Sequence, residues 1–157
     1  MVEELHRPAR RHVDIREIDD TWQADLVDMS AYAKVNRGYR FLLTVIDIFS
    51  KFAWAVPTNT KSGSNITAAM RSVLEQGRQL RRLYADQGKE FFNAHFKRLM
   101  EEYNILLYST FSNLKASICE RFNRTLKTKM WKEFSFRGTY KWIDIFQSNK
   151  HQDILQK

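Results

Sequence analysis

The run FLLTVIDIF at residues 41–49 constrains the fold of this chain more than any other stretch. Only Thr44 and Asp47 interrupt its apolar side chains, and the run is far too short to cross a membrane as a helix. A strand that is apolar on both sides belongs inside a sheet, with protein packed on each face. We therefore expect an α/β fold built around a central strand over residues 39–49.

The sequence on either side of this run predicts a meander of three strands. Residues 22–29 alternate along the chain as a strand does, and Asn36, Arg37 and Gly38 form the turn before the central strand. A third strand over 52–56 is expected to end at Pro57. Then follow a helix from 62–64 to Gly77, a strand at 81–85, a helix around 92–103, a strand at 105–109, and helices at 115–131 and 139–146. This order predicts a mixed five-stranded sheet flanked by helices.

Residues 115–131, KASICERFNRTLKTKMW, predict a helix with two different faces. An apolar stripe recurs every four residues, at Ile118, Phe122, Leu126 and Met130. A second stripe beside it holds Glu120, Arg124, Lys127 and Trp131. One carboxylate ahead of a ridge of cations suits a helix that handles phosphodiesters, because an acid holds metal and cations hold phosphate. Taken alone, the pattern equally fits an ordinary amphipathic surface helix with a Glu and Arg pair.

The composition favours one globular domain with a polyanionic partner. The 157 residues carry a net charge of +8, with the excess in the helix above and in Arg78, Arg81 and Arg82. Nucleic acid is the first candidate partner for such a chain. A lone Cys119 excludes an internal disulfide, and His6 and His12 lack the cysteines that a structural zinc site would need. No apolar run reaches membrane-spanning length, so we expect neither zinc nor a membrane.

Three acids stand out by their position in the predicted elements. Asp25 lies in the middle of a strand, where aspartate is disfavoured, Asp86 ends a strand before Gln87 and Gly88, and Glu120 lies on the basic helix. Two-metal phosphoryl transfer needs such a carboxylate cluster, and oxygen ligands of this kind suit Mg²⁺ or Mn²⁺. Asp28 faces away from Asp25 and is expected to be structural or exposed to solvent. Asp47, just before a turn, is expected to be structural.

Four segments closely resemble the catalytic core of retrovirus-like integrases: WQADLVDM (22–29), FLLTVIDIFSKFAWAVP (41–57), YADQGKEFF (84–92) and ASICERFNRTLK (116–127). They look most like the integrases of Polinton/Maverick-type DNA transposons. The likeness covers residues 18–147, and it implies a ribonuclease H-like fold. We expect residues 1–18 to form an N-terminal extension, 19–147 the core-like domain and 148–157 a divergent tail.

The resemblance also implies an activity. It places a D,D,E triad on Asp25, Asp86 and Glu120, which would bind two Mg²⁺ or Mn²⁺ ions, trim DNA 3′ ends and join them to target DNA. Residues at family positions that contact the element's DNA end are Gln87, Asn123, Arg124 and Lys127. The family works as oligomers on transposon ends and target DNA, so a homo-oligomer and nuclear action are expected, otherwise a cytoplasmic location.

Two other functions fit the sequence. The family's zinc-binding and C-terminal DNA-binding modules do not occur in these 157 residues, and SNKHQDILQK departs from the family pattern. A truncated or host-retained core that binds DNA or a protein partner without catalysis is therefore an alternative. The preserved triad argues against it, because clustered carboxylates repel one another and phosphate without metal. A ribonuclease on the same fold is a third possibility, which rests on analogy of fold alone.

Overall fold

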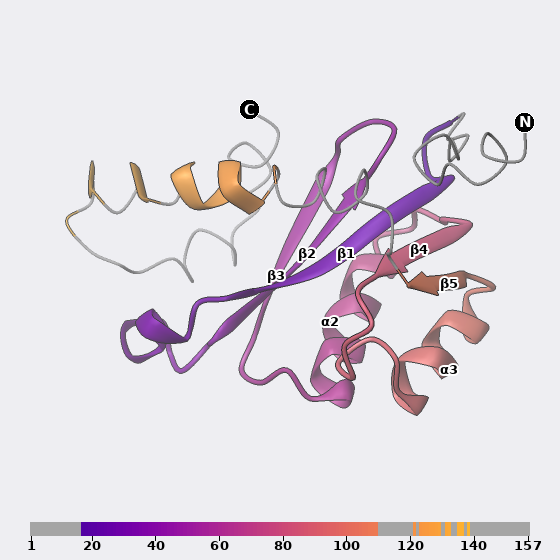
Figure 1. Cartoon of the computed structure of the whole chain (residues 1–157), viewed down its shortest axis with the longest axis horizontal. Coiled ribbons are helices and arrows are strands. Elements are labelled where there is room, and N and C mark those ends of the chain that lie inside the picture. The colour runs from indigo at the N-terminus through magenta and orange to yellow at the C-terminus, as the bar shows by residue number, and fades with distance from the viewer. Residues whose placement is uncertain are drawn as a thin grey trace, which may run out of the picture.

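A computed structural model of the chain describes residues 17–109, 121, 123–129, 131, 132, 135, 136 and 138. The described elements form a five-stranded mixed sheet with helices on both faces (Figure 1). In chain order they are β1 (Thr21–Asp28), η2 (Ser30–Val35), β2 (Phe41–Asp47), β3 (Ala53–Thr58), α2 (Gly63–Leu74), β4 (Arg82–Ala85), α3 (Ala94–Glu102) and β5 (Leu106–Ser109). This order confirms the predicted sequence of elements as far as β5.

The sheet has the order β3-β2-β1-β4-β5, with β1 antiparallel to β2 and parallel to β4. The apolar run occupies β2, which lies between two strands, and Leu42, Leu43, Val45 and Ile46 are all buried. The expectation of a strand covered on both faces is thus confirmed. Strand β1 pairs with β2 along almost its whole length and with β4 at Thr21, Trp22 and Gln23.

One face of the sheet packs on α2 and α3. The cluster there joins Trp22 and Ala24 of β1 to Ile66, Met70 and Val73 of α2 and to Phe96 and Leu99 of α3. Both helices begin at residues that cap their free backbone N–H groups: Ser62 accepts from the Asn65 N–H, and Asn93 accepts from the Phe96 N–H at 2.9 Å. Helix α2 ends three residues before Gly77, which has the left-handed φ of +101°.

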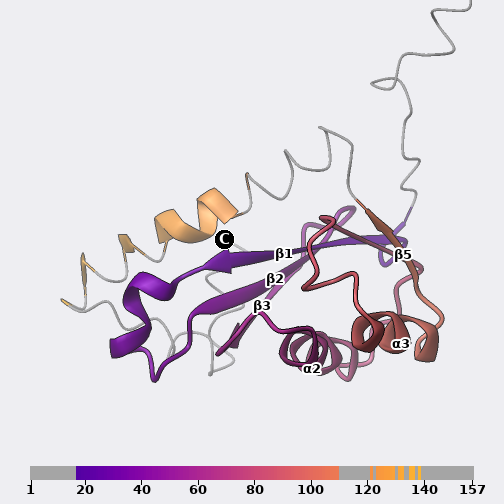
Figure 2. The same cartoon turned by 60° about the horizontal axis from the view of Figure 1, so that its bottom comes forward.

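The other face of β1–β3 is covered by the helical residues between 121 and 132. Figure 2 shows α2 and α3 beneath the sheet and these residues above β1. Leu126 is 1% exposed and packs with Val27, Leu42 and Ala55, so the predicted apolar stripe is confirmed at that position. Burial of one leucine contributes about 2 kcal/mol. Arg124, Lys127 and Trp131 of the second stripe are exposed, as predicted.

Two boundaries differ from the sequence prediction. Pro57 does not end the third strand, because β3 continues to Thr58 and Pro57 pairs with Leu42. An edge strand accommodates proline, since one side of its backbone has no strand to bond. The connection from β1 to β2 is also more than a turn, because the 3₁₀ helix η2 precedes the predicted turn at Asn36 to Gly38.

Each of the three arginines that were expected to favour a polyanionic partner lies near a carboxylate of the fold. Arg78 forms ion pairs with Asp19 at 2.6 Å and with the fully buried Asp47 at 3.0 Å, and its guanidinium lies over the rings of Trp22, Phe52 and Trp54. Arg81 and Arg82 lie 3.4 and 3.9 Å from Asp20. Arg78 thus has a structural role, whereas Arg81, which is 66% exposed, still presents its charge to solvent.

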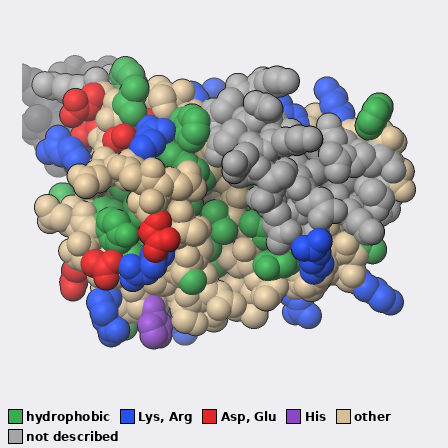
Figure 3. All heavy atoms as spheres, turned by 180° about the vertical axis from the view of Figure 1, so that it is seen from behind, with side chains coloured by type: hydrophobic (Ala, Val, Ile, Leu, Met, Phe, Trp, Pro, Cys, Tyr) green, Lys and Arg blue, Asp and Glu red, His purple; other side chains and the backbone are tan. Residues whose placement is uncertain are grey.

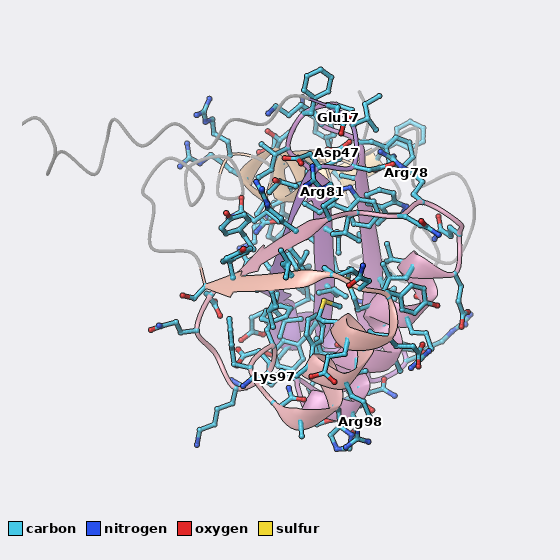
Figure 4. The ribbon with its side chains drawn as sticks, turned by 90° about the vertical axis from the view of Figure 1, so that its right-hand side faces the viewer. Glu17, Asp47, Arg78, Arg81, Lys97 and Arg98 are labelled. Atoms are coloured by element: carbon cyan, nitrogen blue, oxygen red, sulfur yellow. The ribbon has the colours of Figure 1, made fainter. Side chains whose placement is uncertain are left out.

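Asp47 has the structural role expected of it. Its carboxylate accepts hydrogen bonds from the Phe49 N–H, the Ser50 hydroxyl and Arg78, which together fix the turn between β2 and β3. Figure 4 shows Asp47, Arg78 and Arg81 together at one end of the molecule, while Lys97 and Arg98 project from α3 at the other. Asp47 thus anchors a corner of the sheet.

Several predictions fall outside the described residues. They are the extension at 1–16, Glu120, the last helix at 139–146 and the tail at 148–157, so the proposed domain limits stay predictions. Within the described part, no helix is long and apolar enough to cross a membrane.

Candidate active site

The parallel pairing of β1 with β4 brings two of the predicted acids to the same level of the sheet. The last paired residues are Gln23 of β1 and Tyr84 of β4, and Asp25 and Asp86 each follow two positions later. Neighbouring strands run about 4.8 Å apart. The two acids therefore lie at neighbouring positions, Asp25 within β1 and Asp86 directly after β4, although sixty residues separate them in the sequence.

Asp25 lies on the sheet face opposite α2 and α3. Its neighbours along β1, Ala24 and Leu26, pack toward the helices, whereas Val27 joins the cluster with Leu126 on the other face. Alternation along the strand puts Asp25 with Val27. Its carboxylate is half-buried, and its backbone carbonyl accepts from the Thr44 hydroxyl of β2 at 3.3 Å. The side chain thus projects from rigid scaffold toward residues 121–132.

Asn123 joins the basic helical residues to this acid. Its Nδ2 atom donates to Oδ2 of Asp25 at 2.8 Å, across 98 residues of sequence. Sequence reasoning assigned Asn123 to DNA contact and missed this bond, because no local pattern reveals a partner so far along the chain. The bond fixes the orientation of the Asp25 carboxylate, and it holds the basic helical residues against β1.

Asp86 and Gln87 are both exposed in the turn after β4. Oδ1 of Asp86 accepts from the Gly88 N–H at 2.9 Å, which makes a tight turn of the kind aspartate favours. Tyr84, two residues earlier, stacks on Tyr108 of β5 with ring centroids 5.2 Å apart. Burial raises the pKa of the Tyr84 hydroxyl, so this ring stays neutral well above neutral pH.

Asp28 is exposed, as expected, and stands apart from the site. Its carboxylate accepts from the hydroxyl and the N–H of Ser30, and the hydroxyl bond is the larger cause of its lowered pKa. Lys61 and Lys127 lower the pKa further through their charge. Asp28 therefore remains ionised at neutral pH, with cations around it.

Among the described residues, no group of three His, Cys, Asp or Glu side chains converges as a metal site would require. The described part holds Asp25 and Asp86, while the third predicted acid, Glu120, lies outside it. The chemistry of the two acids nevertheless suits a divalent cation, because Asp25 in β1 and Asp86 just after β4 both have carboxylate oxygens as donors. Arg124 and Lys127, both exposed, lie on the helical segment that Asn123 attaches to Asp25.

The fold is that of a retroviral integrase catalytic core. The HTLV-2 integrase catalytic core domain in complex with magnesium (dimeric form) matches with a TM-score of 0.71 at 15% identity, over 89% of this chain and 86% of that one. A chain of the simian T-cell lymphotropic virus intasome, in complex with PP2A regulatory subunit B56 gamma, matches with a TM-score of 0.72 at 16% identity, over 87% and 47%. The catalytic core domain of BIV integrase matches with a TM-score of 0.63 at 14% identity, over 88% of this chain and 79% of that one. These likenesses confirm the predicted ribonuclease H-like fold.

The chain belongs to the integrase core domain family, whose model matches residues 16–110. An uncharacterized transposon-derived protein of Caenorhabditis elegans is 37% identical over 120 residues. That alignment covers 76% of this chain and 42% of the relative, so the chain spans about two fifths of that protein. The predicted family is confirmed, and the Polinton/Maverick subtype stays a prediction.

Proposed function

We propose that this chain is the catalytic core of a transposon-type integrase, a polynucleotidyl transferase that trims DNA 3′ ends and joins them to target DNA. The observation that carries the proposal is the hydrogen bond from Asn123 to Asp25. This bond connects Asp25, which lies near the end of β4, to a helical segment rich in cations. Carboxylates for metal and cations for phosphate are the two requirements of phosphodiester chemistry.

Asp25, Asp86 and Glu120 would hold two Mg²⁺ or Mn²⁺ ions. Carboxylates brought together by the pairing of β1 with β4 would repel one another, and a bound divalent cation would relieve that repulsion. When bound, the ions activate water or a 3′ hydroxyl and stabilise the leaving oxygen. The magnesium in the HTLV-2 core supports this assignment at the level of a shared fold.

The remaining site residues position the DNA. Asn123 orients the Asp25 carboxylate, and Arg124 and Lys127 present cations to the phosphodiester backbone from the exposed side of the same segment. Gln87 is exposed beside Asp86, within reach of a strand that enters the site. Contacts of this kind are largely independent of base sequence.

The partners follow from this activity. We propose transposon ends and target DNA as substrates, a homo-oligomer as the working form, and the nucleus as the place of action. The structural neighbours, which include an intasome and a dimeric integrase core, and the transposon-derived relative support the first two. The nucleus is inferred only from the DNA substrate.

The test is strand joining on a short branched DNA with Mg²⁺ or Mn²⁺, comparing Asp25→Asn with Asp28→Asn. The two aspartates lie on the same strand, three residues apart, and Asp25 is the one that bonds to Asn123. Asp25→Asn should lower the rate at least about a thousandfold, because triad members act as a unit. Glu120→Gln should do the same. Asp28→Asn should stay within about twofold of wild type, or rise slightly, because it removes one negative charge near DNA.

Product that persists in Asp25→Asn would exclude the assigned acid. No product from wild type, with DNA binding intact, would instead favour the core that binds without catalysis. Cleavage of an RNA–DNA hybrid in preference to duplex DNA would favour the ribonuclease.

A further inference from the structure

The connection between β1 and β2 forms a second basic element beside the candidate site. Residues 29–40, named here the η2 loop, contain Lys34, Arg37 and Arg40 and no acidic residue. All three side chains are exposed. The absence of acids continues through β2 as far as Asp47. This was a signal in the sequence, but sequence reasoning treated the segment only as a turn.

The η2 loop has a fixed shape. Asn36 is fully buried and its Nδ2 atom donates to the Tyr32 carbonyl at 2.7 Å, while the Gly38 N–H donates to the Ala33 carbonyl at 2.8 Å. The Met29 N–H closes the loop on the Arg40 carbonyl at 2.6 Å. A loop held in this way presents its cations without the entropy cost of ordering its backbone on binding.

The η2 loop packs against the same helical residues that carry Arg124 and Lys127. The Tyr32 ring meets Trp131 edge to face at 5.7 Å, and Tyr32 and Tyr39 pack against the cluster that contains Leu126. Figures 1 and 2 both show η2 at the end of the molecule where the last described helical residues lie. Lys61 and Lys127 also lie close enough to Asp28 to lower its pKa.

Five exposed cations therefore gather around one end of β1, namely Lys34, Arg40, Lys61, Arg124 and Lys127. They are named here the basic surface. In Figure 3 this end of the molecule lies on the right, where Lys and Arg side chains show and no Asp or Glu is visible among the described atoms. The visible Asp and Glu side chains lie at the opposite end.

We propose that the η2 loop is a DNA-binding element, which extends the track of phosphate contacts from the active site along β1 to Lys34 and Arg40. The inference rests on the proposed function and adds a surface to it. From Asp25 to Asp28 the strand advances about 10 Å, and from Asn123 to Trp131 a helix advances about 12 Å. Loop and helix together thus span several phosphates of a duplex, which carries a charge about every 1.7 Å of its axis.

Duplex DNA fits this surface better than an acidic protein does. The surface is continuous with the acids that would cut DNA, because Asn123 bonds to Asp25 one residue before Arg124. The acid beside it, Asp28, is bonded to Ser30 and offsets part of the charge of Lys61 and Lys127, and the five cations of the basic surface still leave an excess of positive charge for an external anion. Exposed cations spread over two rigid elements match a rod of phosphates, whereas a protein partner would require an apolar centre.

The test compares two double variants in the full chain. Lys34→Gln/Arg40→Gln removes one lysine and one arginine from the η2 loop, and it leaves Arg37, which has a left-handed φ of +57°, in place. Lys97→Gln/Arg98→Gln removes the same pair of residue types from α3, which lies at the other end of the molecule from η2 (Figures 1 and 2). Binding to a random-sequence duplex of about 30 base pairs is measured against salt concentration, without divalent ions, so that no strand is cut.

The loop variant should weaken binding about tenfold, and the slope of log K against log salt should fall by about 0.9 for each phosphate that the variant no longer neutralises. The α3 variant should match wild type in both affinity and salt slope. Equal slopes for the two variants would overturn the role of the η2 loop, and metal-dependent strand joining by wild type would show that the proposed function survives. Absence of DNA binding by wild type would overturn both. Loop-dependent binding to polyglutamate, or to vesicles of anionic lipid, with no such effect on DNA would also overturn the inference.

Discussion

Two ends of this sheet are rich in cations, and they differ in what those cations touch. At one end Arg78 is held by Asp19 and Asp47 and covered by aromatic rings. At the other, the basic surface has the exposed Asp28 beside it. The first end uses charge to stabilise the fold, and the second is the one proposed to bind a polyanion. Net charge alone cannot separate these roles, because the positions of the carboxylates decide between them.

Among the tests of this comparison, Arg78→Met should have the largest effect on stability. Loss of the guanidinium leaves Asp47, which is 0% exposed, with an uncompensated charge, and should lower the free energy of unfolding by about 3–5 kcal/mol. Urea denaturation measures the change. Arg81→Met is the control, since that side chain is 66% exposed and should cost less than about 1 kcal/mol. Equal losses of stability in the two variants would contradict the claim that the buried ion pair matters more than the exposed one.

A second substitution tests whether the basic end is rigid. Asn36→Ala leaves the Tyr32 carbonyl without its amide donor and should cost about 1–3 kcal/mol. It should also speed amide hydrogen exchange at Gly38, whose N–H closes the same loop. The exposed Asn59 supplies the control. Unchanged exchange at Gly38 in Asn36→Ala would mean that the loop does not depend on this side chain.

The smallest effect concerns the acid beside the basic surface. The folded-state pKa of Asp28 is depressed, so its stabilising contribution is present above its ordinary pKa of 3.8 and is lost as the pH falls through the folded value. Ser30→Ala removes the larger cause and should raise this pKa part of the way to 3.8, while the Ser30 N–H bond remains. Carboxylate NMR titration measures it. An unchanged pKa would assign the shift to the Ser30 N–H bond and to Lys61 and Lys127 instead.

The sequence predicted the parts of this structure that depend on local pattern. The alternation of β1, the apolar run of β2 and the start of α2 at Ser62 follow rules of short range, and each is confirmed. The 3₁₀ helix η2 was missed because one short turn has no stripe to detect. The partner of Arg78, 59 residues away, and that of Asn123, 98 residues away, exist only once the sheet has formed. Motif resemblance selected Asp25 in β1 and Asp86 just after β4, but it did not reveal the hydrogen bond that orients Asp25.

The pairing of β1 with two partners also bears on the order of folding. Strands β1, β2 and β3 follow one another in the chain and can associate through short loops. Pairing of β4 with β1 closes a much longer loop, which contains β2, β3 and α2. Contacts of such separation slow the search for the native state. A partly folded chain with the meander complete and β4 undocked would hold Asp25 without Asp86. Such an intermediate could hold phosphates through its cations before it has a complete set of carboxylates to act on them.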